Sequence, residues 1–426
     1  MKKTPLENWI YDRVGLDSHD FGRLKAWQLS KLKEAVCYAR ENSRFYGSRL
    51  KGLPPEAIQT FEDFSALPFT SAKDIAEDSE AFLCVPQRSV SRVVTLYTSG
   101  TTGREKRIFF TDSDLERTVD FFDYGMRCLT NASDRVLILL PGPSYGTIGH
   151  LLKKALARTG TYSEIHGVLQ DPEETAKAIV EQSITCLVGI PIQILYLSRL
   201  KPEVFKQIDK VLLSTDYIPE VLTRELKEKF NCRVYNHYGM TEMGYGGGVE
   251  CEALDGCHMR EQDLYFEIVD PVTGVVLPDG VYGEVVFTTL NREAMPLIRY
   301  RTGDIGAFSD KPCLCGTQLR TLKKILGRFE NAIEVNGRMI PHRKLDEWIL
   351  SFESVAHFKV SKDENRALVF DVTLFDSCQS GGDIESCVRS KIGSDVSIKF
   401  IWRQDLRRLM SKNSMDKRTV KATVEK

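Results

Sequence analysis

The chain has 426 residues, of which 42% are apolar and 27% are charged, which is typical of globular proteins and excludes disordered, collagen-like and coiled-coil chains. Its 58 lysines and arginines nearly balance 59 aspartates and glutamates, so no global charge favours nucleic acid or an anionic membrane as a partner. The first residues lack the apolar core of a secretory signal, and the apolar runs are too short to span a bilayer. We expect two or three domains and a cytoplasmic location.

The first half of the chain predicts helices and then an alternation of strands and helices. Residues 1–70 carry apolar side chains at helical spacing, most clearly over 26–50. Strands are expected at 91–99, 134–142, 185–191, 208–216 and 232–239, and helices at 113–129, 146–160, 174–184 and 218–231. Apolar strands that alternate with helices are typical of a parallel sheet covered on both faces, so we predict an α/β fold.

The pattern changes after Gly244. Valine-rich runs flank turn signals at Thr273-Gly274 and Asp279-Gly280, which predicts an antiparallel β module. The last hundred residues predict a small α+β unit, with helices at 342–352 and 383–392 and strands at 358–363, 366–375 and 396–402. We place a linker at 327–330, which divides the chain into a large N-terminal domain, 1–326, and a small C-terminal domain, 327–426.

The stretch "LYTSGTTGREKRIFF" (96–110) suits phosphate binding, although it does not match the Walker loop, in which the lysine follows the last glycine directly. Gly100 and Gly103 let backbone N–H groups converge on an anion. Hydroxyl groups can donate to phosphate oxygens, and a basic side chain can neutralise their charge. The candidates are Thr98, Ser99, Thr101, Thr102 and Lys106 or Arg107. A plain solvated turn is the alternative.

A second motif, "YNHYGMTEMGYGGG", follows a predicted strand. It places Tyr238, Gly239, Thr241 and Glu242 at the carboxyl edge of the parallel sheet, where ligands of open α/β folds bind. An aromatic ring there can stack on a flat ligand, and a carboxylate can hold Mg²⁺ beside phosphates. A loop with a capping threonine and a solvated glutamate is the alternative.

The third motif is "MPLIRYRTGDIG", in which Asp304 follows a glycine in a predicted turn. A carboxylate in such a place can accept hydrogen bonds from two sugar hydroxyls, as the acidic residue of dinucleotide sites does. An aspartate in an ordinary β-turn is the commoner meaning of these letters.

Four of the eleven cysteines are not isolated. Cys251 and Cys257 precede the β module, and Cys313 and Cys315 follow it, with His258 beside the first pair. Structural zinc takes four cysteine or histidine ligands in a closed tetrahedron, and clustered cysteines in a cytosolic chain indicate metal before disulfide. The sequence therefore predicts a zinc site with Cys251, Cys313 and Cys315, in which Cys257 competes with His258 for the fourth position. Buried free thiols are the alternative.

The order of these motifs is more specific than any one of them. "YTSGTTG" with a following lysine, "YGMTE", "YRTGD" and "GR", in this order, resemble the acyl-adenylate-forming superfamily, which includes acyl-CoA synthetases, luciferases and the adenylation domains of peptide synthetases. More narrowly, the chain resembles the phenylacetate–CoA ligase-like family. The resemblance is strong from about Leu96 to Gly337 and weaker at both ends.

The resemblance implies a role for each matching residue. Thr98, Ser99, Gly100, Thr101, Thr102, Gly103 and Lys106 would form the phosphate loop of an ATP site. Tyr238, beside Gly239, would stack on adenine, Thr241 would contact the α-phosphate, Glu242 would hold Mg²⁺, and Asp304 and Arg328 would bind the ribose. Ser214, Thr215 and Asp216 stand where the family has an adenine and acyl-site loop. For zinc, the resemblance favours His258 over Cys257.

The resemblance also implies a mobile C-terminal domain that supplies a catalytic lysine. None of the four lysines near the end of the sequence matches the family's Gly-Lys form. We assign this role to Lys417, because "DKRTV" places it at a small turn before a strand-like pair, with Lys412 as the second choice. A basic solvated tail is the alternative. The acyl pocket is expected around Tyr145 and Gly146, and around Gly189 and Pro191.

The implied function is that of an AMP-forming acid–thiol ligase. It would activate a carboxylic acid, aromatic or apolar, as acyl-AMP with release of pyrophosphate, and then transfer the acyl group to coenzyme A. ATP, Mg²⁺, coenzyme A and a structural Zn²⁺ are the expected cofactors. Nucleic acid and membrane are not expected partners, and a homodimer is possible by analogy. One alternative passes the acyl group to an amine, a carrier-protein thiol or another acceptor, and a second is a non-catalytic nucleotide-binding homologue.

Overall fold

The computed structural model describes residues 4–16, 19–53, 55–97, 105–375, 381–393 and 395–410. The chain forms two compact units, each built from separate stretches of sequence. The first comprises residues 1–133, 142–162 and 235–325, and the second comprises residues 134–141, 163–234 and 326–426. The division into domains 1–326 and 327–426 stays a prediction. Among the described helices, none is long and apolar enough to cross a membrane.

The first unit begins with helices, as predicted. They are α1 (Pro5–Arg13), α2 (Phe21–Asn42), α3 (Arg44–Arg49), α4 (Phe61–Ser65) and α5 (Ala72–Glu77). The helical pattern over 26–50 is confirmed, and the structure divides it into two helices at Ser43. The backbone of Ser43 is extended, and its hydroxyl accepts the N–H of Tyr46, so that it caps a new helix.

A hairpin and two helices continue this unit. Strands β1 (Arg92–Tyr97) and β2 (Glu105–Phe110) are antiparallel, and Leu96 pairs with Lys106. Helix α6 (Asp112–Met126) starts at a capping box, in which the Thr111 hydroxyl accepts the N–H of Asp114 and the Asp114 carboxylate accepts the N–H of Thr111. Helix α7 (Ile148–Ala157) packs against α6.

The predicted antiparallel β module is present in the first unit. Strands β10 (Leu264–Val269), β11 (Gly283–Thr289) and β12 (Tyr300–Gly306) form an antiparallel sheet in that order. Both predicted turn signals fall in the single connection between β10 and β11, where Gly274 and Gly280 have positive φ angles of 74° and 89°. The phenyl ring of Phe61 stacks on Tyr265 of β10.

Shorter strands complete the first unit. They are β8 (Gly248–Glu250), β9 (Cys257–Met259) and β13 (Thr321–Leu322), which follow β7 (Arg233–Tyr238) in the order β13-β9-β8-β7 with antiparallel pairing. Strands of two or three residues are too short to show a hydrophobic period, so the sequence did not reveal β8, β9 and β13.

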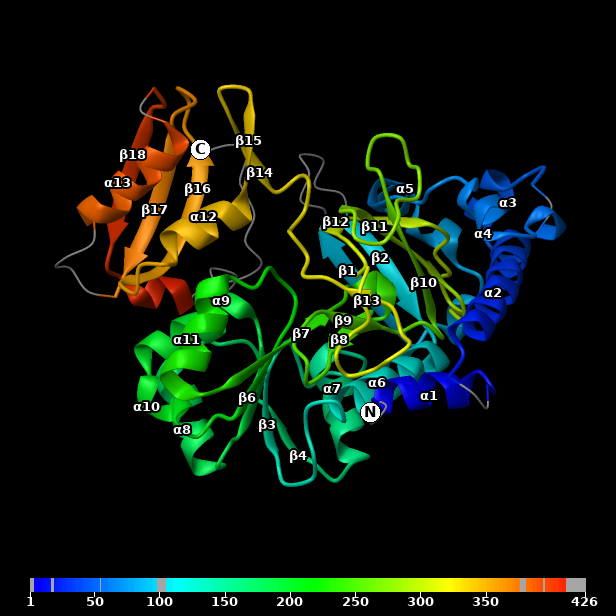
Figure 1. Cartoon of the computed structure of the whole chain (residues 1–426), viewed down its shortest axis with the longest axis horizontal. Coiled ribbons are helices and arrows are strands. Elements are labelled where there is room, and N and C mark those ends of the chain that lie inside the picture. The colour runs from blue at the N-terminus through cyan, green and yellow to red at the C-terminus, as the bar shows by residue number, and fades with distance from the viewer. Residues whose placement is uncertain are drawn as a thin grey trace. The chain divides into compact units, whose positions relative to one another are not determined.

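The second unit contains the predicted parallel strands. Strands β3 (Arg135–Leu139), β5 (Cys186–Gly189) and β6 (Lys210–Leu213) pair in parallel, and β4 (Tyr162–Ile165) lies beyond β3. The accompanying helices are α8 (Pro172–Glu181), α9 (Pro191–Leu200), α10 (Pro202–Phe205) and α11 (Glu220–Phe230), drawn in green in Figure 1. Helix α9 was not predicted, because nearly all of it is buried and its apolar run shows no amphipathic period.

The C-terminal residues of the second unit form the predicted small α+β module. It contains α12 (His342–Ile349), β16 (Val355–Lys362), β17 (Leu368–Leu374), α13 (Gly381–Ile392) and β18 (Ile398–Arg403), after a hairpin of β14 (Ala332–Val335) and β15 (Arg338–Pro341). The strands β16–β18 lie side by side (Figure 1), with β16 antiparallel and β18 parallel to β17. A short 3₁₀ turn, Leu406–Met410, follows.

One buried arginine ties this module to the rest of the second unit. Arg199, at the end of α9, forms two hydrogen bonds with the carboxylate of Glu225 on α11. Its remaining N–H groups donate to the carbonyls of Leu350 (2.6 Å), Phe352 (3.0 Å) and Val355 (2.9 Å). These carbonyls stand at the end of α12 and the start of β16, so a single side chain joins four segments.

Candidate active site

A buried carboxylate lies at the centre of the first unit's candidate site. Glu242 belongs to a 3₁₀ turn, Thr241–Met243, that follows strand β7, and its side chain is only 2% exposed. The loop doubles back tightly, because the N–H of Gly247 donates to the carbonyl of Tyr238. Gly239 is required at this bend, since a Cβ there would lie 2.4 Å from the carbonyl oxygen of Tyr245.

Two side chains from other strands meet this carboxylate. Lys106, on β2, forms an ion pair with Oε1 of Glu242, and the Tyr300 hydroxyl, on β12, donates to the same oxygen at 3.0 Å. Burial alone would raise the pKa of Glu242, but the charge of Lys106 and the two hydrogen bonds outweigh it and lower the pKa below its usual value. Glu242 is therefore an ionised carboxylate, the form that binds Mg²⁺.

The candidate nucleotide-binding residues also meet. Tyr238 ends β7, and its hydroxyl donates to Oδ2 of Asp304 on β12 at 3.1 Å. Tyr238 thus contacts Asp304, and Glu242, four residues later, contacts Tyr300, four residues earlier. The loop after β7 and strand β12 therefore run side by side in opposite directions. The structure brings together Lys106, Tyr238, Gly239, Thr241, Glu242 and Asp304, which the sequence predicted from three separate motifs.

Two of the predicted acyl-pocket residues lie in the same unit. The Tyr145 hydroxyl donates to the carboxylate of Asp112, and just over half of the Tyr145 side chain is exposed. The carbonyl of Gly146 accepts a hydrogen bond from Tyr245 at 3.0 Å. Tyr245 in turn stacks on Phe110, with ring centroids 5.5 Å apart. Tyr245, from the loop that carries Glu242, therefore connects that loop to the Tyr145–Gly146 segment.

The other predicted pocket and nucleotide residues lie in the second unit. Gly189 ends β5, Pro191 begins α9, and the N–H of Ser214 donates to the carbonyl of Gly189 at 3.1 Å. Thr215 has a φ angle of 80°, a conformation that a β-branched residue rarely adopts. The carboxylate of Asp216 accepts the N–H of Tyr217, and Arg328 precedes β14.

Some predicted residues lie outside the described part of the chain. These are Lys417, its alternative Lys412, and the phosphate-loop residues Thr98, Ser99, Gly100, Thr101, Thr102 and Gly103. Their roles stay predictions. Lys106, the last member of the predicted loop, is described and lies against Glu242.

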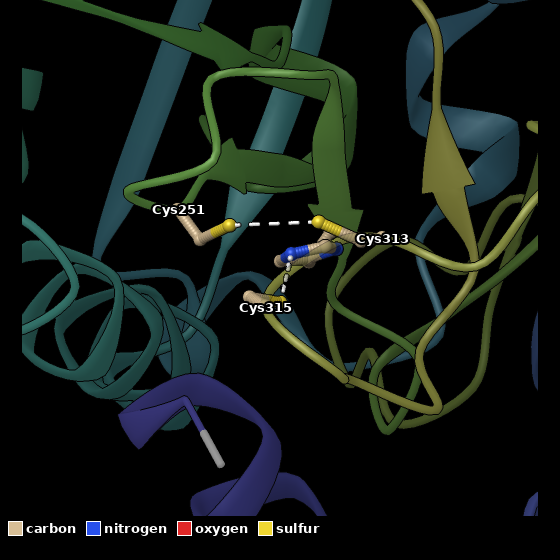
Figure 2. Close-up of side chains that lie close together, drawn as sticks. Cys251, Cys313 and Cys315 are labelled. Carbon is tan, nitrogen blue, oxygen red and sulfur yellow. Dashed lines mark hydrogen bonds between the residues drawn. The ribbon is translucent and has the colours of Figure 1, made fainter. Parts of the chain in front are cut away.

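A second cluster gathers the predicted zinc ligands. One ligand atom each from Cys251, His258, Cys313 and Cys315 lies within 4.8 Å of the others. The sulfurs of Cys251 and Cys313 are 3.7 Å apart, and the sulfur of Cys315 is 3.3 Å from Nε2 of His258 (Figure 2). Tetrahedral zinc with bonds of about 2.0–2.3 Å places its ligands roughly 3.3–3.8 Å apart, so these two distances suit zinc.

The surroundings of the cluster also suit zinc. Cys251, His258 and Cys313 are buried, and burial lowers the pKa of His258 to about 4, so its imidazole is neutral. Its other nitrogen, Nδ1, lies 3.1 Å from the hydroxyl of Thr321, which can fix the orientation of the ring. Cys257, the competing candidate, points elsewhere, since its thiol donates to the carbonyl of Asn236.

The sequence did not reveal two residues that contact the predicted site residues, Tyr300 and Thr321. Tyr300 lies in the quoted motif "MPLIRYRTGDIG", four residues before Asp304, but nothing in the sequence showed that it meets Glu242. Thr321 lies opposite His258 because β13 pairs with β9, and a strand of two residues gives no signal of that pairing.

Comparison with known proteins is consistent with these motifs. The profile of the family described as AMP-binding enzyme matches residues 51–291, more than half of the chain. The chain is 29% identical to a phenylacetate–coenzyme A ligase of Thermus thermophilus, covering 79% of this chain and 78% of that protein. It is 25% identical to a protein of the same name from Escherichia coli, over 91% and 92% of the two chains.

Solved structures agree on the fold. A crystal structure of a 2-hydroxyisobutyryl-CoA ligase in its postadenylation state superposes with a TM-score of 0.78 at 18% identity, covering 94% of this chain and 89% of the other. An O-succinylbenzoate coenzyme A synthetase of Bacillus subtilis aligns over 76% and 69% of the two chains, with a TM-score of 0.52 and 19% identity. The chain therefore belongs to the AMP-binding enzymes of the acyl-adenylate-forming superfamily, and within them it is phenylacetate–CoA ligase-like.

Proposed function

We propose that the protein is an AMP-forming acid–thiol ligase. It activates a carboxylic acid as acyl-AMP, with release of pyrophosphate, and transfers the acyl group to coenzyme A. Membership of the family and relatives named phenylacetate–coenzyme A ligase support this proposal. The observation that carries it is the convergence of three motifs in one unit, where Tyr238 contacts Asp304 and Lys106 contacts Glu242.

The chemistry explains why these side chains are needed. A carboxylate is a poor electrophile, because oxide is a poor leaving group, whereas AMP leaves readily from an acyl-adenylate. Attack of the carboxylate oxygen on the α-phosphorus brings two anions together, so the protein must hold both and neutralise charge. Tyr238 would stack on adenine, Asp304 would accept hydrogen bonds from the ribose hydroxyls, and Thr241 would donate to the α-phosphate.

The negative charge of the phosphates would be neutralised by a Mg²⁺ ion held by Glu242 and by the ammonium group of Lys106. Glu242 is buried and ionised, and it would hold a Mg²⁺ ion that offsets the charge of the phosphates. Lys106, together with the loop Thr98–Gly103, would bind the phosphates themselves. Arg328 and the segment Ser214–Asp216 would complete the nucleotide site, and Lys417 would be supplied by a mobile domain spanning 327–426.

The acid is proposed to be aromatic or apolar. The residues proposed to line its pocket, Tyr145, Gly146, Gly189 and Pro191, carry no charge, and the relatives are named for phenylacetate. An enzyme that passes the acyl group to an amine or a carrier-protein thiol is the second candidate. The amide bond synthetase among the structural neighbours, with a TM-score of 0.52, shares the fold. A homodimer and a cytoplasmic location stay predictions.

A structural zinc ion is a separate proposal. Cys251, His258, Cys313 and Cys315 would close a tetrahedron that ties the loop after β8 and strand β9 to the segment before β13. Such a site adds to folding stability and takes no part in the reaction.

The adenylation proposal is tested by acid-dependent exchange of labelled pyrophosphate into ATP. Wild-type protein should catalyse exchange with at least one aromatic or apolar acid, and Glu242→Gln should reduce the rate at least about 100-fold, as expected when a main charge-stabilising group is lost. Exchange that is unaffected by Glu242→Gln would remove this carboxylate from the site.

A further inference from the structure

The carboxylate of Glu242 has an unusual set of partners. Both Lys106 and Tyr300 reach the same atom, Oε1, although a carboxylate offers two oxygens. Lys106 also donates to the Tyr300 hydroxyl at 3.4 Å, so the three groups form a closed triangle. The side chains of Glu242 and Lys106 are 2% and 13% exposed. A charge buried this deeply needs a counter-ion, and here Lys106 supplies it.

The position of Lys106 conflicts with the role proposed for Glu242. A carboxylate oxygen that holds Mg²⁺ lies about 2.1 Å from the ion. An ammonium group on the same oxygen would then face a divalent cation a few ångströms away, in an interior where like charges repel strongly. The two cations therefore compete for Oε1. The flexible four-carbon stem of lysine lets its charge move while strand β2 stays in place.

We propose that Lys106 is a placeholder for the metal: it neutralises Glu242 in the nucleotide-free protein and yields Oε1 when a divalent cation arrives with the nucleotide, while Tyr300 keeps the carboxylate in position. This inference rests on the proposed metal-binding role of Glu242. The released ammonium group is then available to the phosphates, so one movement prepares both the metal site and the phosphate site. It also keeps the empty protein from binding free divalent cations tightly.

Tyr300 is suited to stay in place through this exchange. Its hydroxyl is neutral, so it can donate to the carboxylate whichever cation is present. The ring is 1% exposed, belongs to strand β12, and packs against Phe287 of the neighbouring strand with centroids 5.4 Å apart. Tyr300 is therefore a positioning residue, which acts on the reaction only through Glu242.

Binding of Mn²⁺, followed by electron paramagnetic resonance of the free ion, tests the exchange in the full chain without nucleotide. Lys106→Met should bind Mn²⁺ at least about tenfold more tightly than wild type, because the competing charge is gone. Lys106→Arg keeps a positive charge and should bind no better than wild type. Adding Glu242→Gln to Lys106→Met should abolish the gain. Equal Mn²⁺ affinity in wild type and Lys106→Met would refute the proposal that Lys106 competes with the metal for Glu242.

Tyr300→Phe provides a second test if Lys106→Met folds poorly, since it removes only a hydroxyl. It should weaken binding of Mn²⁺ in the presence of ATP about tenfold, while binding of metal-free ATP stays unchanged, a split that a general loss of stability would not produce. Unchanged Mn²⁺ affinity in Tyr300→Phe would refute its positioning role. The metal role of Glu242 is judged separately: if Glu242→Gln binds Mn²⁺ and ATP like wild type, the proposed function of that carboxylate fails, whatever Lys106 does.

Discussion

The hydroxyl of Tyr238 lies 3.1 Å from Oδ2 of Asp304, and this contact joins two motifs that are 66 residues apart in the sequence. It positions the ring of Tyr238 and the carboxylate of Asp304 in one place, as a nucleoside requires if its base stacks and its sugar hydroxyls are bound. The same two segments meet again at Glu242 and Tyr300.

Substitutions at this contact should separate recognition of the ribose from recognition of the base. Asp304→Ala removes both acceptors for the ribose hydroxyls and should raise the KM for ATP at least about tenfold. Tyr238→Phe keeps the stacking ring and loses one hydrogen bond, so its KM should rise only a few-fold. Pyrophosphate exchange measured over a range of ATP concentrations gives both values. A larger effect for Tyr238→Phe than for Asp304→Ala would contradict these assignments.

Purified protein should contain about one zinc per chain if the cysteine cluster is a structural site. Cys313→Ser should lose most of this metal and melt at a lower temperature, because three ligands hold zinc poorly. Cys257→Ser is the matched control, since it removes a buried thiol that bonds to Asn236 and should keep its metal. Metal analysis by mass spectrometry decides, and equal zinc content in wild type and Cys313→Ser would remove the site.

The hydrogen bonds of Arg199 to Glu225 and to three backbone carbonyls should be needed to hold the C-terminal module against helices α9 and α11. Arg199→Met leaves Glu225 buried without its main partner and should cost about 3–5 kcal/mol. Hydrogen exchange at residues 350–360 should become faster. Lys177→Met is the control: it removes an exposed ion pair with Glu181 and should cost less than about 1 kcal/mol. Equal hydrogen-exchange rates in both variants would show that Arg199 does not hold the C-terminal module against α9 and α11.

The buried carboxyl of Glu261 should make stability depend on pH. Burial raises its pKa to about 7, although Arg320 opposes this shift. An acid whose pKa is raised on folding contributes stability that is complete below its unfolded pKa of about 4.3 and is lost as the pH rises through the folded value. The wild-type free energy of unfolding should therefore fall, relative to Glu261→Gln, between about pH 4.5 and 7. Parallel urea-unfolding profiles for the two proteins would contradict this prediction.

The backbone at Thr215 should be strained. Its φ angle of 80° brings a β-branched side chain close to its own backbone, a cost of about 1–2 kcal/mol that glycine avoids. Thr215→Gly should raise the free energy of unfolding by about 0.5–1 kcal/mol after the extra entropy lost by glycine is subtracted. Thr215→Ala keeps the Cβ and should gain nothing. Chemical denaturation measures both, and destabilisation by Thr215→Gly would show that the threonine side chain matters more than strain.

Much of the fold followed from hydrophobic period and turn residues. The alternation from residue 134 to 239 predicted strands β3, β5, β6 and β7 and helices α7, α8 and α11, because the strands fall in unbroken apolar runs and the helices show a helical apolar period. Helix α9 was not predicted because it is buried on nearly all sides, and β8, β9 and β13 were not predicted because they are short. The break at Ser43 was missed, since a cap overrides the helical pattern on either side of it.

The roles of the site residues were predicted from the order of the motifs that contain them, because no single motif was specific on its own. Tyr238, Glu242 and Asp304 were identified because their motifs occur together. In the structure Tyr238 contacts Asp304, and Glu242 contacts Tyr300 on the same strand as Asp304. Tyr300 could not be identified in this way, because its role comes from the pairing of a strand with a distant loop. His258 could be chosen over Cys257 only by resemblance, since the alternation of side chains along β9 decides which of two adjacent residues faces the cluster.

The central claim is that this protein activates a carboxylic acid through its adenylate and delivers it to coenzyme A. A panel of aromatic and apolar carboxylic acids, scored for pyrophosphate release and for acyl-CoA with and without coenzyme A, tests it most directly. The account predicts that one class of acid releases pyrophosphate in an ATP-dependent reaction and yields acyl-CoA only when the thiol is present. Turnover that proceeds equally well without coenzyme A, or no pyrophosphate release with any acid, would contradict it.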